Sequence, residues 1–234
     1  MKMEINICLR EMLFKMMDSL KENLKNNNLE FEEVTPELLW IKDFLTKEEL
    51  DFIWNVINAA SQEDWEVEYM GNLKRFCLEK FGREDVDNLV AEGKFEITQN
   101  WVDKNLNIKH HPEQNVFYGR LADIIHPSFP GLELSGLATI QRMQKGVELK
   151  SHTDQHTDPS IHYATIIYIN DDYIDGELFF PNKDIALRPK PGDLLFFPGN
   201  EEYEHGVKHV GDGPIRYVIV GFIKEIGHYE RNRY

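Results

Sequence analysis

Cysteine is scarce in this sequence: Cys8 and Cys77 are the only two among 234 residues. They do not form a close pair, so the sequence predicts neither a disulfide framework nor a zinc-binding cysteine motif. Long apolar runs are also lacking. No segment approaches the roughly 18–20 apolar residues of a membrane-spanning helix, and Glu4, Arg10 and Lys15 interrupt any signal peptide at the start. These absences predict a cytoplasmic protein with reduced thiols and no membrane association.

Positive charge is in short supply as well. Asp and Glu number 41 against 26 Lys and Arg, which gives a formal net charge of −15. Such a surface repels a phosphate backbone, and no long run of Lys or Arg provides a local basic patch. We therefore expect no nucleic-acid partner. An acidic surface of this kind either serves solubility alone or attracts a basic protein or peptide.

Apolar residues recur at helical spacing from Leu9 to Leu24, which predicts an amphipathic helix ending near Asn26. Such a stripe usually packs on its own domain, and the alternative is a helix that binds a partner. The length suits one domain with extensions. We expect residues 1–36 to form this helix and a linker, and residues 37–234 to form the domain.

Further helices follow in the N-terminal half. Thr46 is a predicted N-cap, with Glu49 at the capping-box position and apolar residues behind it. A weaker pattern predicts a helix over residues 72–92, and another helix is expected from His111 to a stop at Pro127. The N-terminal half is therefore predicted to be helical.

The pattern changes after residue 136. Short β-rich runs alternate with Gly, Pro, Asn and Asp turns, and the gaps are too short for the crossover helices of a parallel sheet. Eight such strands predict an α+β, mainly β fold: a double-stranded β-helix, or jelly roll, with supporting N-terminal helices and a core at about residues 137–224. The predicted strands cover residues 137–144, 147–154, 161–169, 177–181, 184–188, 193–197, 204–210 and 214–223.

The segment His152-Thr153-Asp154 carries the predicted chemistry. Successive side chains on a strand point to opposite faces, so His152 and Asp154 should lie side by side, with Thr153 facing away. His205, from another strand, would complete a set of two imidazoles and one carboxylate on one side of a metal ion. That set is the facial triad of non-haem Fe(II) oxygenases, which leaves positions open for a cosubstrate and O₂. A His-x-Asp doublet alone is a weak signal, because most such pairs are merely hydrogen-bonded.

His209 competes with His205 for the third ligand position, because both share one face of the strand predicted at 204–210. Residues 211–214 (GDGP) are typical of a turn, which predicts a hairpin that sets His209 almost opposite Arg216. His205 lies further along and leaves room for a five-carbon diacid between the metal and the guanidinium. We therefore choose His205 as the ligand.

Arg216 is the predicted anion-binding residue. On the last strand it shares a face with three apolar residues, Val218, Val220 and Phe222, so this face should point inward. A buried guanidinium needs an anionic partner, and its geometry matches a carboxylate such as the distal acid of 2-oxoglutarate. The alternative is a structural ion pair with an Asp or Glu residue.

These residues resemble the 2-oxoglutarate/Fe(II)-dependent dioxygenase superfamily, specifically its prolyl 4-hydroxylase-like branch. The resemblance covers most of residues 40–224, and several elements agree in order and spacing. The matching segments are His152-Thr153-Asp154 and residues 41–50 (IKDFLTKEEL), 164–170 (ATIIYIN), 176–181 (GELFFP), 190–198 (KPGDLLFFP), 205–207 (HGV) and 213–217 (GPIRY).

The resemblance implies an enzyme that hydroxylates an unactivated C–H bond, with oxidative decarboxylation of 2-oxoglutarate to succinate and CO₂. Its implied cofactor is Fe(II), held by His152, Asp154 and His205. The implied cosubstrates are 2-oxoglutarate, bound by Arg216, and O₂, with ascorbate as the reductant. The expected substrate is a prolyl residue of a protein or peptide. No side-chain acid or base is assigned beyond the iron centre.

The chain departs from the family pattern at several positions. Met143 stands where many prolyl hydroxylases have tyrosine, and Leu178 stands where threonine is frequent. Arg216 replaces the lysine of collagen-type enzymes. Phe222 replaces a tryptophan, and it also occupies the place of a second arginine that the related nucleic-acid demethylases carry. The expected pocket lining is Met143, Tyr163, Leu178, Val218 and Phe222.

Other functions remain open from the sequence. They are hydroxylation of a small molecule or free amino acid, a non-catalytic jelly-roll binding module, and a zinc hydrolase that uses the same ligands. Residues 93–112 are a candidate lid over the substrate, with an ordinary surface connection as the alternative. The oligomeric state is left open.

Overall fold

The computed structural model describes residues 2–61, 64–68, 103–107, 114–135 and 139–226. The helices and short 3-10 turns in these ranges are α1 (Lys2–Asn26), α2 (Lys47–Ala59), α5 (Gln114–Ile125), α6 (Asp154–Thr157), η3 (Pro181–Lys183) and η4 (Glu201–Tyr203). The strands are β1 (Phe31–Thr35), β2 (Leu38–Ile41), β3 (Trp65–Glu68), β4 (Asp103–Asn107), β5 (Leu132–Ser135), β6 (Thr139–Met143), β7 (Leu149–His152), β8 (Ile161–Tyr168), β9 (Leu178–Phe180), β10 (Ile185–Leu187), β11 (Leu194–Pro198), β12 (His205–Val207) and β13 (Arg216–Glu225).

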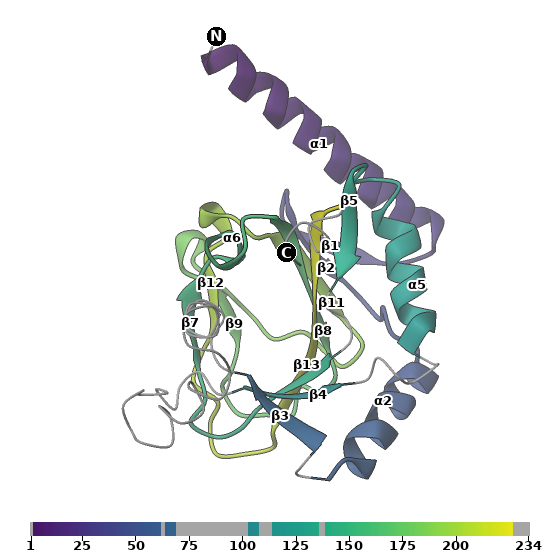
Figure 1. The fold of residues 1–234 in the computed structure, drawn as a ribbon, viewed down its shortest axis with the longest axis vertical. Helices are drawn as coiled ribbons and strands as arrows, with labels where there is room; N and C mark the ends of the chain where they lie inside the picture. Colours follow the sequence, from purple (N-terminus) through teal and green to yellow (C-terminus); the bar gives the residue numbers. More distant parts are fainter. Residues whose placement is uncertain (1, 62–63, 69–102, 108–113, 136–138, 227–234) are drawn as a thin grey trace, which may run out of the picture.

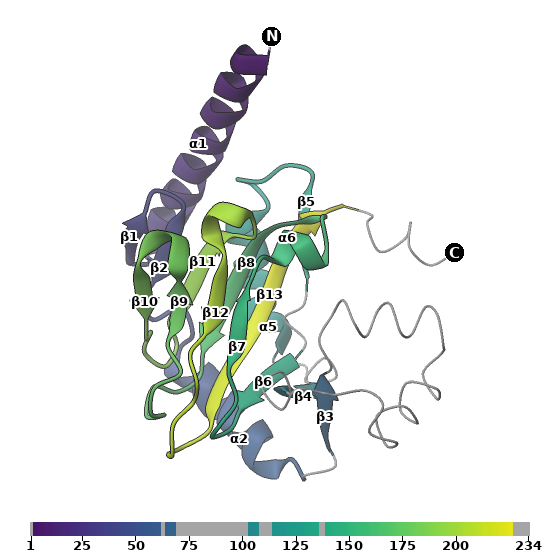
Figure 2. The same ribbon diagram turned by 90° about the vertical axis from the view of Figure 1, so that its left-hand side faces the viewer.

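The strands form two sheets that face each other (Figures 1 and 2). The larger sheet has nine strands in the order β1-β2-β11-β8-β13-β6-β4-β3, with β5 also paired to β13, and the smaller sheet has the order β10-β9-β12-β7. The pairings between named strands are antiparallel, as expected when connections are too short for crossover helices. The mainly β fold class is confirmed, and each strand from β6 to β13 overlaps a predicted strand.

Two apolar cores hold these layers together. One core lies between the large sheet and helices α1, α2 and α5, which cover its outer face (Figure 1). The other core lies between the two sheets and contains Leu178 and Phe180 from the small sheet, with Leu195 and Phe197 from the large sheet. The inter-sheet space is the interior that the candidate site faces.

Strand β8 shows how one segment serves both cores. Tyr163 and Ile167 belong to the core under the helices, whereas Ala164, Ile166 and Tyr168 belong to the core between the sheets. Side chains on a strand alternate between its faces, and both faces of β8 are covered. This double burial explains why the strand is a nearly continuous apolar run.

The prediction of a helical N-terminal half was wrong for part of the described chain. Strands β1 to β5 lie before residue 136, and β1, expected to belong to a linker, pairs with β2. Strands β3 and β4 extend the large sheet beyond β6. Strands β1, β3 and β4 are only four or five residues long, and about half or more of their residues are charged or polar, so each is too short for its pattern to predict a strand clearly.

The helix predicted at the N-terminus agrees better with the structure. Helix α1 ends at Asn26, and its Met17, Leu20 and Leu24 are buried in the outer core, so the C-terminal part of this helix packs on its own domain. None of the helices described is apolar enough over a bilayer-spanning length to cross a membrane. The helix predicted at 72–92 lies outside the described residues. So does most of the lid candidate at 93–112, whose residues 103–107 form β4.

Helix α2 begins with the predicted capping box. The Thr46 hydroxyl accepts from the Glu49 N–H at 3.2 Å, and the Glu49 carboxylate accepts from the Thr46 N–H at 2.8 Å. The same carboxylate accepts two hydrogen bonds of 2.8 Å from Arg120 on α5. Glu49 therefore caps α2 and ties it to α5.

Replacing Glu49 with alanine will lower the free energy of unfolding by about 2–4 kcal/mol, because it removes a cap and a charge-assisted pair. Thr46→Ala, which removes only the cap, will cost about 1 kcal/mol. Glu48→Ala is the matched control, since Glu48 is exposed in the same first turn. Urea denaturation checks the order of the three variants, and equal losses for Glu48→Ala and Glu49→Ala would contradict it.

Candidate active site

His152 and Asp154 lie where β7 passes into α6. The strand ends at His152, and Asp154 opens a four-residue helix, so the prediction that both lie on one strand was wrong in this detail. Thr153 between them is extended, with φ −117° and ψ 140°, and its hydroxyl caps α6 by accepting from the His156 N–H at 3.2 Å. The extended residue still sets its neighbours side by side, with His152 Nε2 3.8 Å from Asp154 Oδ1.

His205 joins this pair through strand pairing. It begins β12, and β12 pairs with β7 so that His205 stands opposite His152. The two imidazole centroids are 4.6 Å apart, and His205 Nε2 lies 3.9 Å from Asp154 Oδ2. One ligand atom from each of the three residues lies within 4.8 Å of the others. The structure thus brings together the three side chains that the sequence singled out.

Backbone carbonyls orient both imidazoles. His152 Nδ1 lies 2.9 Å from the carbonyl oxygen of Lys150, and His205 Nδ1 lies 3.1 Å from that of Tyr203. A carbonyl only accepts, so each Nδ1 carries the proton and each Nε2 keeps a free lone pair. Metal-ligating histidines usually have this arrangement.

Burial shapes the electrostatics of the three groups. It raises the pKa of Asp154 to about 6, against the opposing charges of His152 and Lys224. Burial also lowers the pKa of His205 to about 4. Burial lowers the pKa of His152 most, and the nearby His205 lowers it further. Uncharged imidazoles beside a buried carboxylate are the protonation states from which a metal is bound.

The residues fit a divalent metal ion. Asp154 Oδ2 is buried and has no hydrogen-bond partner among the described residues. Such an orphaned carboxylate oxygen is costly unless a ligand satisfies it. Two imidazole nitrogens and one carboxylate on one side of an ion leave its other positions open, which is the ligand set of non-haem iron sites.

Arg216 begins β13 and is only 2% exposed. Its guanidinium donates to Met143 Sδ at 3.5 Å and to the Tyr168 hydroxyl at 3.3 Å, and its carbon lies 5.2 Å from the Tyr168 ring centroid. No carboxylate pairs with it in the part of the chain that the structure describes, and its Nε has no partner there. The described residues therefore do not support the alternative of a structural ion pair.

Tyr168 and Tyr173 are neighbours of Arg216 that the sequence analysis missed. The guanidinium carbon lies 5.7 Å from the Tyr173 ring centroid, and both rings are buried. Burial raises the pKa of Tyr168 to about 12, so its hydroxyl keeps its proton. Strand alternation on β8 could have predicted the position of Tyr168. This residue shares a face with Ala164 and Ile166, which point into the interior between the sheets.

Four of the five residues predicted to line the pocket face the interior between the two sheets. Met143, Leu178 and Val218 belong to the inter-sheet core, and Phe222 packs against it. Tyr163 was wrong. It lies on the other face of β8, where it stacks on Phe196 in the outer core, because its parity is opposite to that of Tyr168.

The predicted hairpin between the strands of His209 and Arg216 was also wrong. Strand β12 belongs to the small sheet and β13 to the large one, so the chain crosses from one layer to the other through residues 211–214. His209 is exposed, and its carbonyl accepts from the Gly176 N–H. His205, and not His209, lies beside His152 and Asp154, but the hairpin from which His205 was chosen is not formed.

A polar groove of about 400 Å³ adjoins the metal-ligand segments. One side is formed by the start of α6 and its cap, which flank Asp154. The other side is formed by η4, which precedes His205. The lining residues include two carboxylates and no lysine or arginine: Thr153, Gln155, His156, Asn200, Glu201 and Glu202.

Comparisons with known proteins agree with this site. Residues 138–224 match the family model of the 2OG-Fe(II) oxygenase superfamily. The structure is similar to a prolyl hydroxylase from Trichoplax adhaerens, solved with a peptide fragment of the hypoxia inducible factor oxygen degradation domain, with 14% identity and a TM-score of 0.63 over 97% of this chain and 96% of that one. A 2OG-Fe(II) oxygenase family oxidoreductase from Burkholderia pseudomallei gives 13% identity and a TM-score of 0.54 over 89% and 90% of the two chains. No curated protein sequence matches the chain.

The fold and the matched segment define a jelly-roll oxygenase, which is an oxidoreductase. The match over residues 138–224 is to the 2OG-Fe(II) oxygenase superfamily, the family that the sequence resemblance predicted. At such low identities the two solved structures show a shared fold and nothing finer. The matched family is one that uses Fe(II) as cofactor, with 2-oxoglutarate and O₂ as cosubstrates.

Proposed function

We propose that this protein is an Fe(II)- and 2-oxoglutarate-dependent hydroxylase that acts on a prolyl residue of a protein or peptide. His152, Asp154 and His205 would hold the iron, and Arg216 would bind the distal carboxylate of 2-oxoglutarate. The observation that carries the proposal is the buried guanidinium. It has no acidic partner among the described residues, and it faces the same interior as the three ligand candidates.

The chain's own residues have separable tasks. When bound, the iron supplies the oxidative chemistry that cleaves 2-oxoglutarate to succinate and CO₂ and hydroxylates a C–H bond. Arg216 and the Tyr168 hydroxyl offer donors to one carboxylate, as a guanidinium does in bidentate pairs. Met143, Leu178 and Val218 make the surrounding wall apolar, which keeps water away and strengthens that interaction.

Two observations support a peptide substrate. The similar enzyme from Trichoplax adhaerens is bound to a peptide in its solved structure. The groove beside α6 carries Glu201 and Glu202, of which Glu202 is paired with Lys183, on a chain of net charge −15. Such a groove favours a peptide with basic residues near the modified position. The cytoplasmic location and the use of ascorbate stay predictions from the sequence.

We expect the purified protein to form succinate from 2-oxoglutarate when supplied with Fe(II), O₂ and ascorbate, slowly alone and faster with a substrate peptide. A peptide library that samples proline and basic residues, read by mass for the gain of one oxygen, tests the substrate class. Oxygen gain confined to a small molecule would replace the peptide proposal. Activity supported by zinc without 2-oxoglutarate, or no succinate under any condition, would refute the oxygenase function itself.

A further inference from the structure

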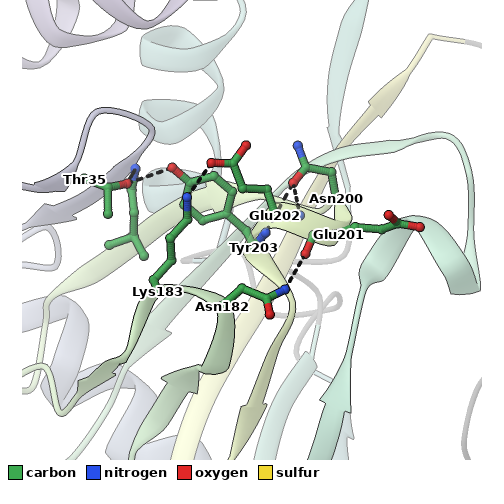
Figure 3. A network of polar contacts seen from close by, with 8 residues as sticks. Thr35, Asn182, Lys183, Asn200, Glu201, Glu202 and Tyr203 are labelled. Carbon is green, nitrogen blue, oxygen red and sulfur yellow. Dashed lines mark hydrogen bonds and ion pairs between the residues drawn. The ribbon is translucent and has the colours of Figure 1, made fainter.

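Tyr203 joins the metal-ligand segment to a hairpin that is distant in the sequence (Figure 3). Its side chain is buried, and its hydroxyl lies 2.8 Å from that of Thr35 at the end of β1. The Thr35 hydroxyl also accepts a 3.1 Å hydrogen bond from the Leu38 N–H at the start of β2. The β1–β2 hairpin therefore anchors the 3-10 turn η4, whose last residue is Tyr203.

Two further contacts fix η4 from its other sides (Figure 3). The Asn200 side chain accepts from the backbone N–H groups of Glu202 at 3.1 Å and of Tyr203 at 3.3 Å. Lys183 forms an ion pair with Glu202, and its ammonium lies 4.6 Å from the centroid of the Tyr203 ring. The turn is thus held by a cap, an ion pair and a hydroxyl pair.

The position of this turn determines how His205 points. The carbonyl of Tyr203 accepts from His205 Nδ1 at 3.1 Å. The rings of Phe197 and Phe180 lie 4.8 Å and 5.9 Å from the imidazole centroid and pack around it. A shift of the Tyr203 backbone would move the carbonyl to which the imidazole donates, and would turn Nε2 away from Asp154.

We infer that Tyr203 is a positioning residue for His205, and that the Thr35 hydroxyl holds Tyr203 in place. The inference rests on the proposed function, because it concerns the orientation of a metal ligand. Outer partners of metal-binding histidines typically change metal affinity by about 10- to 100-fold when they are removed. The two hydroxyls act through the turn, so we expect a loss of about 10-fold, at the lower end of that range.

Co(II) titration followed by visible absorption tests this inference, because Co(II) replaces Fe(II) in such sites and its absorption band reports the ligand geometry. Tyr203→Phe and Thr35→Val will each weaken Co(II) binding by about 10-fold and alter the band. The double variant will lose little more than the weaker-binding single variant, because each single substitution already removes the hydrogen bond between the two hydroxyls. Thr35→Val carries the test alone if Tyr203→Phe does not fold.

Tyr118→Phe is the matched control. It removes a tyrosine hydroxyl that donates to the Leu134 carbonyl, on the helical side of the large sheet. It will lower the melting temperature without changing Co(II) affinity or the absorption band. Wild-type affinity and spectrum in Tyr203→Phe and Thr35→Val would overturn the inference even if both variants melted earlier. A wild-type protein that failed to bind Co(II) at one site per chain would instead refute the proposed metal site.

Discussion

Replacing His205 with alanine will abolish succinate formation and weaken Fe(II) binding by at least about 100-fold, since removing even an outer partner of a metal-binding histidine costs up to about that factor. The residue is 4% exposed and stands against His152 and Asp154, and no other His, Cys, Asp or Glu of the described residues joins this group. Anaerobic Fe(II) titration and a succinate assay measure the two losses.

His209→Ala is the matched control for that variant. His209 comes four residues later in the same segment and was the competing ligand by sequence, but its side chain is exposed. It is expected to retain wild-type iron affinity and turnover. If His209→Ala lost the iron and His205→Ala kept it, the assignment of the third ligand would be reversed.

Replacing Arg216 with methionine will raise the 2-oxoglutarate concentration needed for half-maximal turnover by about 30- to 1,000-fold, with little loss of Fe(II) affinity. Charge-assisted hydrogen bonds of a guanidinium to a carboxylate contribute about 2–4 kcal/mol, which corresponds to that range. Methionine keeps most of the side-chain volume but donates no hydrogen bond. Turnover measured over a range of 2-oxoglutarate concentrations checks the shift.

The same variant will not destabilise the protein when 2-oxoglutarate is absent. Arg216 has no acidic partner among the described residues, so a buried charge is replaced by an apolar group of similar size, and this is often neutral or stabilising. Arg120→Met gives the contrast. It breaks the pair with Glu49 and will melt earlier, while its 2-oxoglutarate requirement stays unchanged. A large drop in the melting temperature of Arg216→Met would show that the guanidinium serves the fold.

Local patterns carried most of what the sequence could predict. Alternation and turn residues located the strands from β6 to β13, and the Thr46–Glu49 spacing located the start of α2. The metal-ligand candidates were recognised because His152 and Asp154 are close in sequence and a late histidine follows in the right order. These signals depend on neighbouring residues or on a resemblance, so no knowledge of the sheet order was needed.

The errors arose where packing between distant segments decides the outcome. The composition of residues 211–214 is typical of a hairpin turn. In the structure these residues instead connect β12 of the small sheet to β13 of the large sheet. Parity on β8 distinguishes Tyr168 from Tyr163, yet both faces of that strand are apolar, so the sequence does not say which face is the pocket. Strands β1, β3 and β4 are short and largely polar, and they are strands because β2, β4 and β6 of the large sheet offer them partners.

The candidate metal ligands all come from the small sheet and the helix that follows β7, whereas Arg216 comes from the large sheet. On the proposed function, a single cosubstrate molecule would span the gap between the two layers. The length of the cosubstrate would then have to match the distance between the metal ligands and Arg216, which is set by the spacing of the two sheets and not by one side chain. A shorter or longer diacid could not be accommodated by exchanging one residue, so selectivity for this cosubstrate would be a property of the spacing of the whole sandwich.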